Sequence, residues 1–352
     1  MKTRIIKIDP QQPKEEDLRT AADVIRNGGL VIIPTETVYG IAANMLNSDT
    51  IRRLAEIKQR PKDKPFSLLI SDKETVEDYA VNIPVSAYKL IDKFWPGPLT
   101  LILKSKENGT IGMRMPDNEI ALEIIVKAGV PVVCPSANLS GRPAPVDFED
   151  AMKDLDGLVD LAIDSGRVSL GLESSVVDLS TGSLSVLREA ALKKTEIEKT
   201  AKKKIVLFVC TGNSCRSVMA QAQLSKKLRE RNRFDVGVLS AGIMMFAGSG
   251  ATDATKEILR REGMDVSGHR SQKVDREMLR KSDFILVMEH LHEQRILEMA
   301  PELKNRVFLL KEFAKISGNN LDIADPIANS LEFYDKTFRI IKEAVEKVIE
   351  II

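Results

Sequence analysis

Short apolar runs alternate with amphipathic helical segments along all 352 residues, and this alternation restricts the possible folds more than any other feature. Apolar runs bounded by turn residues predict strands, here at 29–35, 66–71, 99–104, 130–136, 204–209, 282–288 and 305–310. Helical periodicity predicts helices between them, at 48–60, 118–129, 217–232, 251–263 and 330–352. Strands that alternate with helices predict the α/β fold class.

A lysine-rich stretch divides the sequence into two parts. Residues 191–203 carry five lysines and two glutamates and lack Gly, Pro and aromatic residues, which is typical of an exposed helix or tether. At about 100–200 residues per domain, the length allows two domains. We therefore expect a domain over 1–190, a linker over 191–203 and a domain over 204–352. Because the linker offers no residues suited to a core, few contacts should cross it.

The composition excludes several classes of protein. The 52 basic residues nearly balance the 51 acidic ones, and aromatic residues make up only 5%, so neither a nucleic-acid coat nor a base-stacking platform is expected. No run reaches the ~18 apolar residues of a membrane span, and the N-terminus lacks the apolar core of a signal peptide. Three cysteines argue against a disulfide framework. We expect a cytoplasmic protein without a membrane partner.

The most informative run is Cys210-Thr-Gly-Asn-Ser-Cys-Arg216-Ser217, which lies between a predicted strand and a predicted helix. A loop that opens a helix directs backbone N–H groups at one point and binds anions. A cysteine at such a point favours its nucleophilic thiolate form. Arg216 can hold the same anion as a bidentate fork, and Ser217 can donate a hydrogen bond to the thiolate.

From residue 204 onward, the sequence resembles the low-molecular-weight protein-tyrosine phosphatase family. The Cys-x5-Arg-Ser loop, Ser240-Ala-Gly242, Gly268-His269-Arg270 and Asp325-Pro326 carry the resemblance. It implies a phosphorylated protein as substrate, Cys210 as the residue that becomes phosphorylated, Arg216 as its partner and Asp325 as the acid that protonates the leaving group. It also implies a phosphate-binding loop of Thr211, Gly212, Asn213, Ser214, Cys215 and Ser217.

Three positions depart from the pattern of this family and leave the substrate open. Ile327 and Ala328 stand where aromatic residues often stack on phosphotyrosine, and Glu289 replaces a frequent Asp. Ser214 is small, whereas tyrosine-directed members often have a bulky aliphatic residue there and the arginine-phosphatase branch has Thr. Phosphotyrosine and phosphoarginine therefore both stay possible.

Three polar clusters mark the first half. Lys58, Arg60 and Lys64 belong to a basic run after a predicted helix, and Ser136 and Asn138 follow an apolar strand. Small polar residues at the carboxyl end of a strand lie where open α/β sheets bind ligands. The third cluster is the strand-to-turn run that contains residues 33–40. No Walker motif and no Cys-x2-Cys pair occurs, and no metal held by the protein is expected.

Together, these clusters over about residues 5–190 resemble the YrdC family of threonylcarbamoyl-AMP synthases. Further matches are WPGPLT from Trp95 to Thr100, Gly112-Met-Arg114 and Glu173-Ser-Ser175. The resemblance implies a YrdC-like twisted mixed α/β sheet, followed by a Rossmann-like parallel-sheet phosphatase domain. It implies L-threonine, bicarbonate and ATP with Mg²⁺ as reactants, and tRNA as a partner only indirectly, through a downstream transferase. The residues implied for ATP are Lys58, Arg60, Lys64, Ser136, Asn138 and Arg188, and those for threonine are Thr35, Arg114 and Ser175.

The residues also allow two other functions. The first half can be a nucleotide-binding or RNA-binding module that positions the phosphatase, although four retained polar residues, Lys58, Arg60, Ser136 and Asn138, favour catalysis. The cysteine loop can be a phosphate sensor, although Cys210, Arg216 and Asp325 together favour turnover.

Overall fold

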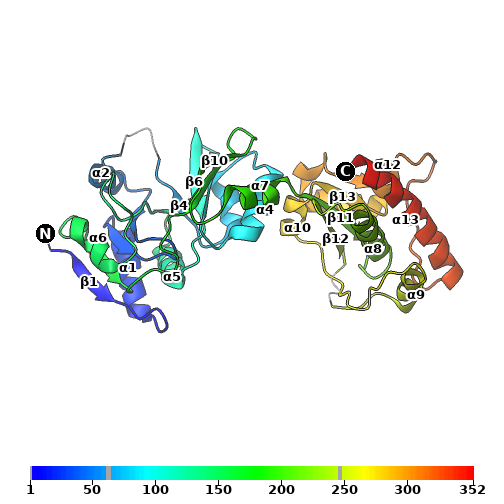
Figure 1. Cartoon of the computed structure of the whole chain (residues 1–352), viewed down its shortest axis with the longest axis horizontal. Helices are drawn as coiled ribbons and strands as arrows, with labels where there is room; N and C mark the ends of the chain where they lie inside the picture. The colour runs from blue at the N-terminus through cyan, green and yellow to red at the C-terminus, as the bar shows by residue number, and fades with distance from the viewer. Residues whose placement is uncertain (1, 61–64, 245–247) are drawn as a thin grey trace. The chain divides into compact units, whose positions relative to one another are not determined.

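The computed structural model describes residues 2–60, 65–244 and 248–352. The chain separates into two compact units, Met1–Ala201 and Lys202–Ile352, which we call the first and second units. Figure 1 traces the elements of both units.

The first unit is built on one mixed sheet. Among the described residues it has ten strands, in the order β1-β8-β2-β3-β7-β4-β6-β5-β9-β10. Parallel and antiparallel pairs occur side by side, since β2 pairs parallel with β8 and antiparallel with β3. The strands are β1 Arg4–Lys7, β2 Val31–Ile33, β3 Gly40–Asn44, β4 Leu68–Leu69, β5 Leu99–Lys104, β6 Thr110–Arg114, β7 Val132–Val133, β8 Leu161–Asp164, β9 Ser175–Asp178 and β10 Ser185–Arg188.

Both faces of this sheet are buried. Val31 and Ile33 of β2 join one hydrophobic cluster and Ile32 joins another, as the alternation of side chains along a strand requires. Helices α1 and α5 pack against the first cluster, and α2 and α6 contribute to the second. The helices are α1 Glu15–Arg26, α2 Ser48–Ile57, α3 Val76–Tyr79, α4 Val85–Phe94, α5 Glu119–Ala128, α6 Phe148–Leu155 and α7 Lys194–Lys202.

Helix α7 corrects the prediction that the lysine-rich stretch contributes nothing to a core. Ile197 and Ala201 are buried in the hydrophobic cluster that contains Trp95. Lys93 of α4 also bonds Glu196 and Thr200 of α7. The two apolar residues stand among lysines in the sequence, so the prediction overlooked them. Residues four apart on a helix share one face, which brings Ile197 and Ala201 to the same side of α7. The helix is therefore the last element of the first unit.

The second unit contains a parallel sheet of four described strands, in the order β12-β11-β13-β14. Figure 1 shows α8 and α13 beside this sheet, where they share a core with one face of β11. The strands are β11 Lys204–Cys210, β12 Val236–Gly242, β13 Phe284–Val287 and β14 Val307–Leu309. The helices are α8 Arg216–Glu230, α9 Asp253–Arg261, α10 Arg276–Lys281, α11 His290–Met299, α12 Leu310–Phe313 and α13 Leu331–Ile351.

The order of the strands places Cys210 at a natural binding position. The chain continues from β11 to β12 on one side and reaches β13 on the other. Ligands bind outside the carboxyl ends of strands at such a switch point, because the connections leave in opposite directions. Cys210 is the last residue of β11. The predicted α/β class, with a mixed sheet followed by a parallel sheet, is thus confirmed.

Candidate functional sites

The predicted phosphate loop connects β11 to the N-terminus of α8. The helix begins at Arg216, and among the described residues the side chain of its N-cap residue, Cys215, does not cap the N–H groups of the first turn. The first N–H groups of a helix lack partners within the helix. Together with the positive end of the helix dipole, they make this loop an anion site.

Asn213 holds the shape of the loop from inside. It is fully buried, and its φ of 51° lies in the left-handed region that Asn tolerates better than most residues. Its Oδ1 accepts from the backbone N–H of Gln272 at 3.0 Å, so its Nδ2 must be the atom that donates to Ser217 Oγ (3.0 Å) and Ser240 Oγ (2.9 Å). Ser217 therefore keeps its own proton for the Cys210 Sγ, which lies 3.0 Å from its Oγ.

Arg216 lies beneath the loop with only 1% of its surface exposed. Its Nη1 donates to Glu289 Oε2 at 2.6 Å and to the carbonyl of Ile323 at 2.8 Å. Its Nη2 contacts Thr211 Oγ1 at 3.0 Å and Asp325 Oδ2 at 2.5 Å. Its buried Nε makes no hydrogen bond to the described residues, so a donor remains for a bound oxyanion.

His292 connects α11 to the loop and was missed by the sequence analysis. Its Nδ1 accepts from the backbone N–H of Glu289 at 3.1 Å, so the neutral ring carries its proton on Nε2, 3.0 Å from Thr211 Oγ1. Burial, reinforced by the charge of Arg216, lowers the pKa of His292 to about 4. The chain has only three histidines, and His292 stands three residues after Glu289, which was the available signal.

The other predicted loop residues lie close to this network. Cys215 is buried, and its Sγ lies 3.5 Å from both Thr252 Oγ1 and Tyr334 Oη. The carbonyl of Ser214 accepts from the N–H of Thr252. The loop passes directly over Gly242, where a Cβ would lie 2.7 Å from the Thr211 carbonyl oxygen. A side chain at Gly242 would therefore displace the loop.

In the first unit, Lys58 joins two of the predicted clusters. Its Nζ donates to the carbonyls of Ser136 (2.8 Å) and Asn138 (2.6 Å) and to Asn138 Oδ1 (2.8 Å). Ser136 Oγ also donates to Asn138 Oδ1 at 2.6 Å. Burial, with added repulsion from Arg60, lowers the pKa of Lys58 to about 8. The ammonium group thus fixes the turn that follows β7.

Arg60 lies close enough to Lys58 for its charge to lower the pKa of that lysine, and burial lowers the pKa of Arg60 itself. Its Nη2 donates to the carbonyl of Pro65 at 2.7 Å, and its guanidinium lies over the ring of Phe66. Lys64, the third predicted ATP ligand of the basic run, lies outside the described residues. In the described part of the run, Lys58 therefore contacts the Ser136–Asn138 turn, and Arg60 lies within electrostatic reach of Lys58.

Arg114 and Thr35 occupy a second corner of the first unit. Arg114 ends β6, is buried, and donates from Nε to the carbonyl of Gly97 at 3.2 Å. Its Nη2 lies 2.6 Å from Glu36 Oε2. Thr35 Oγ1 donates to the carbonyl of Val38 at 2.7 Å and so closes a local turn. Glu36, which the sequence analysis did not assign, is the partner of Arg114.

Ser175 and Arg188 lie in the last strands of the first unit. The buried Ser175 hydroxyl donates to the carbonyl of Leu192 and accepts from the N–H groups of Ala190 and Leu192. Arg188 pairs with Glu173 at 2.6 Å and bonds the carbonyl of Ser174 at 2.9 Å. Burial lowers the pKa of Lys58, and the charge of Glu173 offsets a part of this effect.

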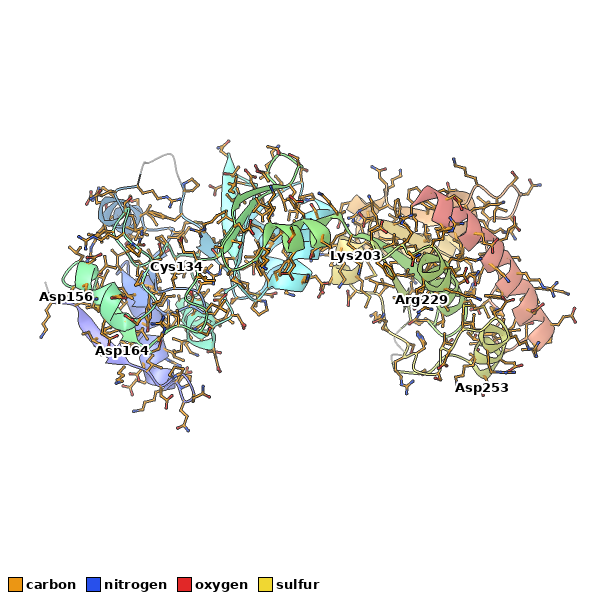
Figure 2. The ribbon with its side chains drawn as sticks, viewed as in Figure 1. Cys134, Asp156, Asp164, Lys203, Arg229 and Asp253 are labelled. Atoms are coloured by element: carbon orange, nitrogen blue, oxygen red, sulfur yellow. The ribbon has the colours of Figure 1, made fainter. Side chains whose placement is uncertain are left out.

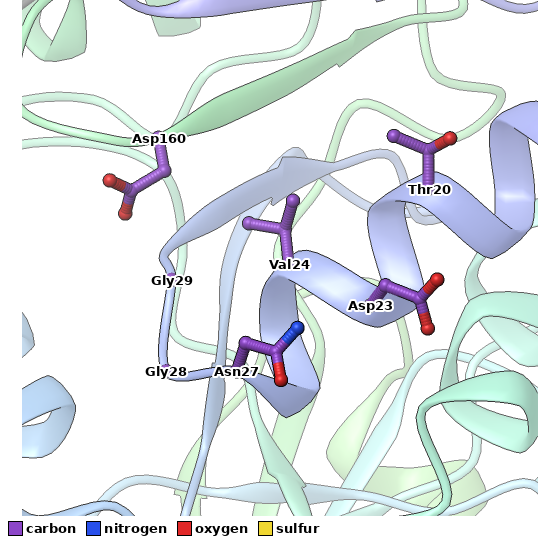
Figure 3. Close-up of a pocket in the computed structure, with 7 residues that line it drawn as sticks. All are labelled: Thr20, Asp23, Val24, Asn27, Gly28, Gly29 and Asp160. Atoms are coloured by element: carbon purple, nitrogen blue, oxygen red, sulfur yellow. The ribbon is translucent and has the colours of Figure 1, made fainter.

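Other features of the first unit offer less chemistry. An open hollow of about 520 Å³ lies at the C-terminal end of α1 and is lined by Gly28 and Asp160, among other residues (Figure 3). Asp160 already accepts from Leu30 N and from Arg53, so its charge is satisfied. Cys134, marked in Figure 2, has its pKa raised to about 12 by burial. Among the described residues we find no cluster of three potential metal ligands and no helix long and apolar enough to span a bilayer.

The second unit is thus defined as a parallel α/β domain that presents a cysteine and a buried arginine at one phosphate-binding loop. The first unit is a mixed-sheet domain with two cationic corners. Residues 205–352 match the family model described as "Low molecular weight phosphotyrosine protein phosphatase". Residues 23–190 match the Sua5/YciO/YrdC family model, described as "Telomere recombination".

Relatives of known sequence and structure agree with the family match of the first unit. Over 195 residues the chain is 41% identical to the threonylcarbamoyl-AMP synthase of Pyrococcus abyssi. This alignment covers 53% of this chain and 57% of that protein. A putative threonylcarbamoyl-AMP synthase of Methanocaldococcus jannaschii is 35% identical over 201 residues, covering 54% of this chain and 95% of that protein. The crystal structure of P. abyssi Sua5 complexed with L-threonine is 25% identical, covers 98% of both chains and has a TM-score of 0.54.

The chain belongs to the Sua5/YciO/YrdC family through its first unit, and its second unit is a low-molecular-weight phosphatase domain. The chain spans little more than half the length of the P. abyssi synthase.

Proposed function

We propose that the chain is a bifunctional enzyme. The first unit joins L-threonine, bicarbonate and ATP into threonylcarbamoyl-AMP, with release of pyrophosphate and water. That product serves the formation of threonylcarbamoyladenosine in tRNA through a downstream transferase. The second unit removes phosphate from a phosphorylated protein. Support for the first activity comes from the named synthase relatives and from the P. abyssi structure with L-threonine.

The observation that carries the synthase proposal is the contact of Lys58 with the Ser136–Asn138 turn. Attack of a carbamate on the α-phosphate brings two anions together, so positive charge is needed at that point. Lys58, Arg60 and Lys64 supply it in our proposal, and Ser136, Asn138 and Arg188 position the nucleotide. Thr35, Arg114 and Ser175 are the residues proposed for threonine. Magnesium enters with the phosphates of ATP.

A pyrophosphate-release assay tests this activity. Release from ATP should require both threonine and bicarbonate, and Lys58→Ala should lower it about a hundredfold. Lys106→Ala, which removes an exposed lysine of the same unit, is the matched control and should behave like wild type. Release that does not depend on threonine would refute the assignment.

In the second unit we propose that the Cys210 thiolate attacks the phosphorus and forms a phosphocysteine, while Asp325 protonates the leaving atom. Water then releases phosphate. The supporting observation is the hydrogen bond from Ser217 to the sulfur, because it stabilises the thiolate that the attack requires. Arg216 meets the developing charge on the phosphoryl oxygens.

The test of this activity uses a matched pair of cysteine variants. Cys210→Ser should abolish phosphatase turnover, since a serine hydroxyl stays protonated where a thiolate is needed, and should leave phosphate binding in place. Cys134→Ser, in the first unit, should turn over phosphopeptide at the wild-type rate. Residual activity of Cys210→Ser near that of wild type would exclude the covalent route.

Phosphoarginine is the second candidate substrate. Ile327 follows the Asp325-Pro326 pair, and its N–H bonds Asp325 Oδ1 at 3.1 Å, while its side chain is 56% exposed. An aliphatic side chain there offers no ring to stack on phosphotyrosine and suits the methylene chain of arginine. Turnover of matched phosphotyrosine and phosphoarginine peptides decides between the two substrates.

A further inference from the structure

The hydroxyl group of Thr211 has a proton that no described residue accepts. Its Oγ1 lies 3.0 Å from His292 Nε2 and 3.0 Å from Arg216 Nη2. A guanidinium can only donate, and His292 Nε2 carries the ring proton because Nδ1 accepts from the N–H of Glu289. The hydroxyl oxygen therefore accepts two hydrogen bonds, which use both of its lone pairs. Among the residues that the structure describes, this oxygen makes no further hydrogen bond, so its own proton is available to a ligand.

The ring of His292 is held so that it cannot exchange its donor and acceptor roles. It is fully buried and takes part in a reciprocal capping box with Glu289 at the start of α11. A ring flip would place a carbon atom where each nitrogen now lies, and it would break the bonds to Glu289 and Thr211 together. Glu289 Oε2 lies farther from Nε2, at 3.6 Å, and is already bound to Arg216. Nε2 therefore stays a donor to Thr211.

The available proton lies beside the position that a phosphoryl oxygen would take. Arg216 Nη2 bonds two oxygens, Thr211 Oγ1 and Asp325 Oδ2, the latter at 2.5 Å. A phosphoryl group that displaces Asp325 from Nη2 would bring an oxygen next to the Thr211 hydroxyl. Thr211 also follows Cys210 directly in the loop and is only half-buried, so a ligand can reach it. An oxyanion is the acceptor that this O–H lacks.

We propose that the Thr211 hydroxyl donates a hydrogen bond to a non-bridging oxygen of the phosphoryl group during its transfer, and that His292 is the positioning residue that keeps Thr211 a donor. The inference rests on the phosphatase activity proposed above. The O–H bond of Thr211 stays intact throughout, while the Cys210 sulfur forms the new bond to phosphorus and Asp325 protonates the leaving atom. A donor that is fixed before the substrate arrives meets the charge on the phosphoryl oxygens without reorganisation.

The occupied lone pairs also exclude another role for Thr211. A hydroxyl with a free lone pair can accept a hydrogen bond from the water that hydrolyses the phosphocysteine. Because His292 and Arg216 fill both lone pairs, Thr211 offers that water no acceptor. Its donor role concerns the phosphoryl oxygens, which are present in both steps of the reaction. The formation of the phosphocysteine and its hydrolysis should therefore both depend on this hydroxyl.

Steady-state kinetics of the full chain on a phosphopeptide tests the hydroxyl. Thr211→Val keeps the shape of the side chain and should lower kcat/KM by about ten- to a hundredfold. Thr211→Ser keeps the hydroxyl and should stay within about threefold of wild type. The matched control is Thr337→Val, since Thr337 Oγ1 bonds the Phe333 carbonyl within α13, and this variant should behave like wild type. Equal kcat/KM of Thr211→Val and wild type would overturn the donor role.

A double-mutant cycle tests the part of His292. His292→Asn removes the N–H donor to Thr211 and should lower kcat/KM by about fivefold or more in the otherwise wild-type chain. In the Thr211→Val background, the same change should alter kcat/KM by less than about twofold, because a positioning residue acts only through the hydroxyl. An equal loss in both backgrounds would mean that His292 acts independently of Thr211. Should the asparagine variants not fold, equal losses in Thr211→Val and Thr211→Ser would overturn the proposal.

Binding of inorganic phosphate gives a readout without turnover. In the Cys210→Ser background, Thr211→Val should weaken phosphate binding by about fivefold or more in calorimetry, and unchanged affinity would contradict the proposed hydrogen bond. The outcomes also separate this inference from the phosphatase proposal. If wild type releases phosphate from neither a phosphotyrosine nor a phosphoarginine peptide, both fail. If wild type turns over either peptide through Cys210 and Thr211→Val does so equally well, only the role of Thr211 is overturned.

Discussion

At the scale of single residues, Arg216 shows how the second unit keeps a charged group ready. Its guanidinium is buried against Glu289 and Asp325, two carboxylates that offset its charge. Asp325 has two possible positions in the proposed reaction, on Arg216 as here or on the leaving atom of the substrate. In the proposed reaction Asp325 therefore competes with phosphate for Arg216 as a carboxylate, and it supplies the proton to the leaving atom as a carboxylic acid.

Replacement of Asp325 should separate these two effects. Asp325→Asn should slow substrates with poor leaving groups by about 10²–10⁴-fold, and activated aryl phosphates far less, because only the former need the proton. Inorganic phosphate should inhibit the variant more strongly, since a competing charge has left Arg216. Steady-state kinetics with both substrate types measures this, with Asp335→Asn on α13 as the control. Equal slowing of both substrates would show that Asp325 is not the acid.

His292 should make the second unit sensitive to acid. Its pKa of about 4 in the fold lies below its ordinary value of 6.5, so the unfolded chain takes up the proton first as the pH falls. The stability that depends on the neutral ring is then present above about pH 6.5 and is lost toward pH 4. Between pH 7 and 4.5, wild type should lose on the order of 2 kcal/mol more free energy of unfolding than His292→Gln. Urea unfolding of residues 202–352 measures it, and parallel losses would contradict the neutral-ring assignment.

At the scale of elements, the contact of β12 with the phosphate loop explains why a glycine ends that strand. A Cβ on Gly242 would lie 2.7, 2.9 and 3.0 Å from backbone atoms of Thr211, Asn213 and Gly212. Gly237 of the same strand is a matched position. Around a Cβ added there, all atoms closer than 3.8 Å belong to a flexible side chain.

Gly242→Ala should therefore impair the loop, whereas Gly237→Ala should not. We expect kcat/KM of Gly242→Ala to fall about a hundredfold, because the loop backbone must move away from its productive geometry. The stability should fall by about 1–3 kcal/mol. Phosphatase kinetics and thermal unfolding of the two variants give the comparison. Similar kinetics for both would mean that the loop tolerates the displacement.

The sequence could predict local arrangements of elements but not contacts between distant segments. The order of strands, loop and helix around Cys210 is local, so the pattern of residues 204–217 predicted it. The partner of Arg114 was not predictable, because Glu36 follows β2 and Arg114 ends β6, and only the strand order of the sheet brings them together. The bond between His292 and Thr211 likewise joins segments that are 81 residues apart in the sequence. Pairings over such distances depend on topology, which periodicity does not encode.

At the scale of the whole molecule, we propose that the two units fold independently. The boundary lies after residue 201, and α7 packs in the core of the first unit through Ile197. A fragment ending at residue 192 should therefore be less stable than one ending at 202, by about 2 kcal/mol or more from the loss of Ile197 burial alone.

Trp95 lies in the same hydrophobic cluster as Ile197 and reports on it, since it is the only tryptophan of the chain. Its fluorescence during thermal unfolding compares the two fragments, and Ile197→Ala in the full chain is a test without truncation. Lys199→Ala, on the same helix, serves as the control. Equal melting of the fragments 1–192 and 1–202 would show that α7 does not stabilise the first unit.

Helix α7 also bears on how such a chain can be assembled from separate genes. A recombination joint placed at the first lysine of the stretch would detach Ile197 and Ala201 from the core that they complete. A joint between Lys202 and Lys204 cuts after the helix and before β11, so it spares the cores of both partners. Only a few consecutive codons therefore allow the second domain to be exchanged for another without unfolding the first, and engineered hybrids should be joined there.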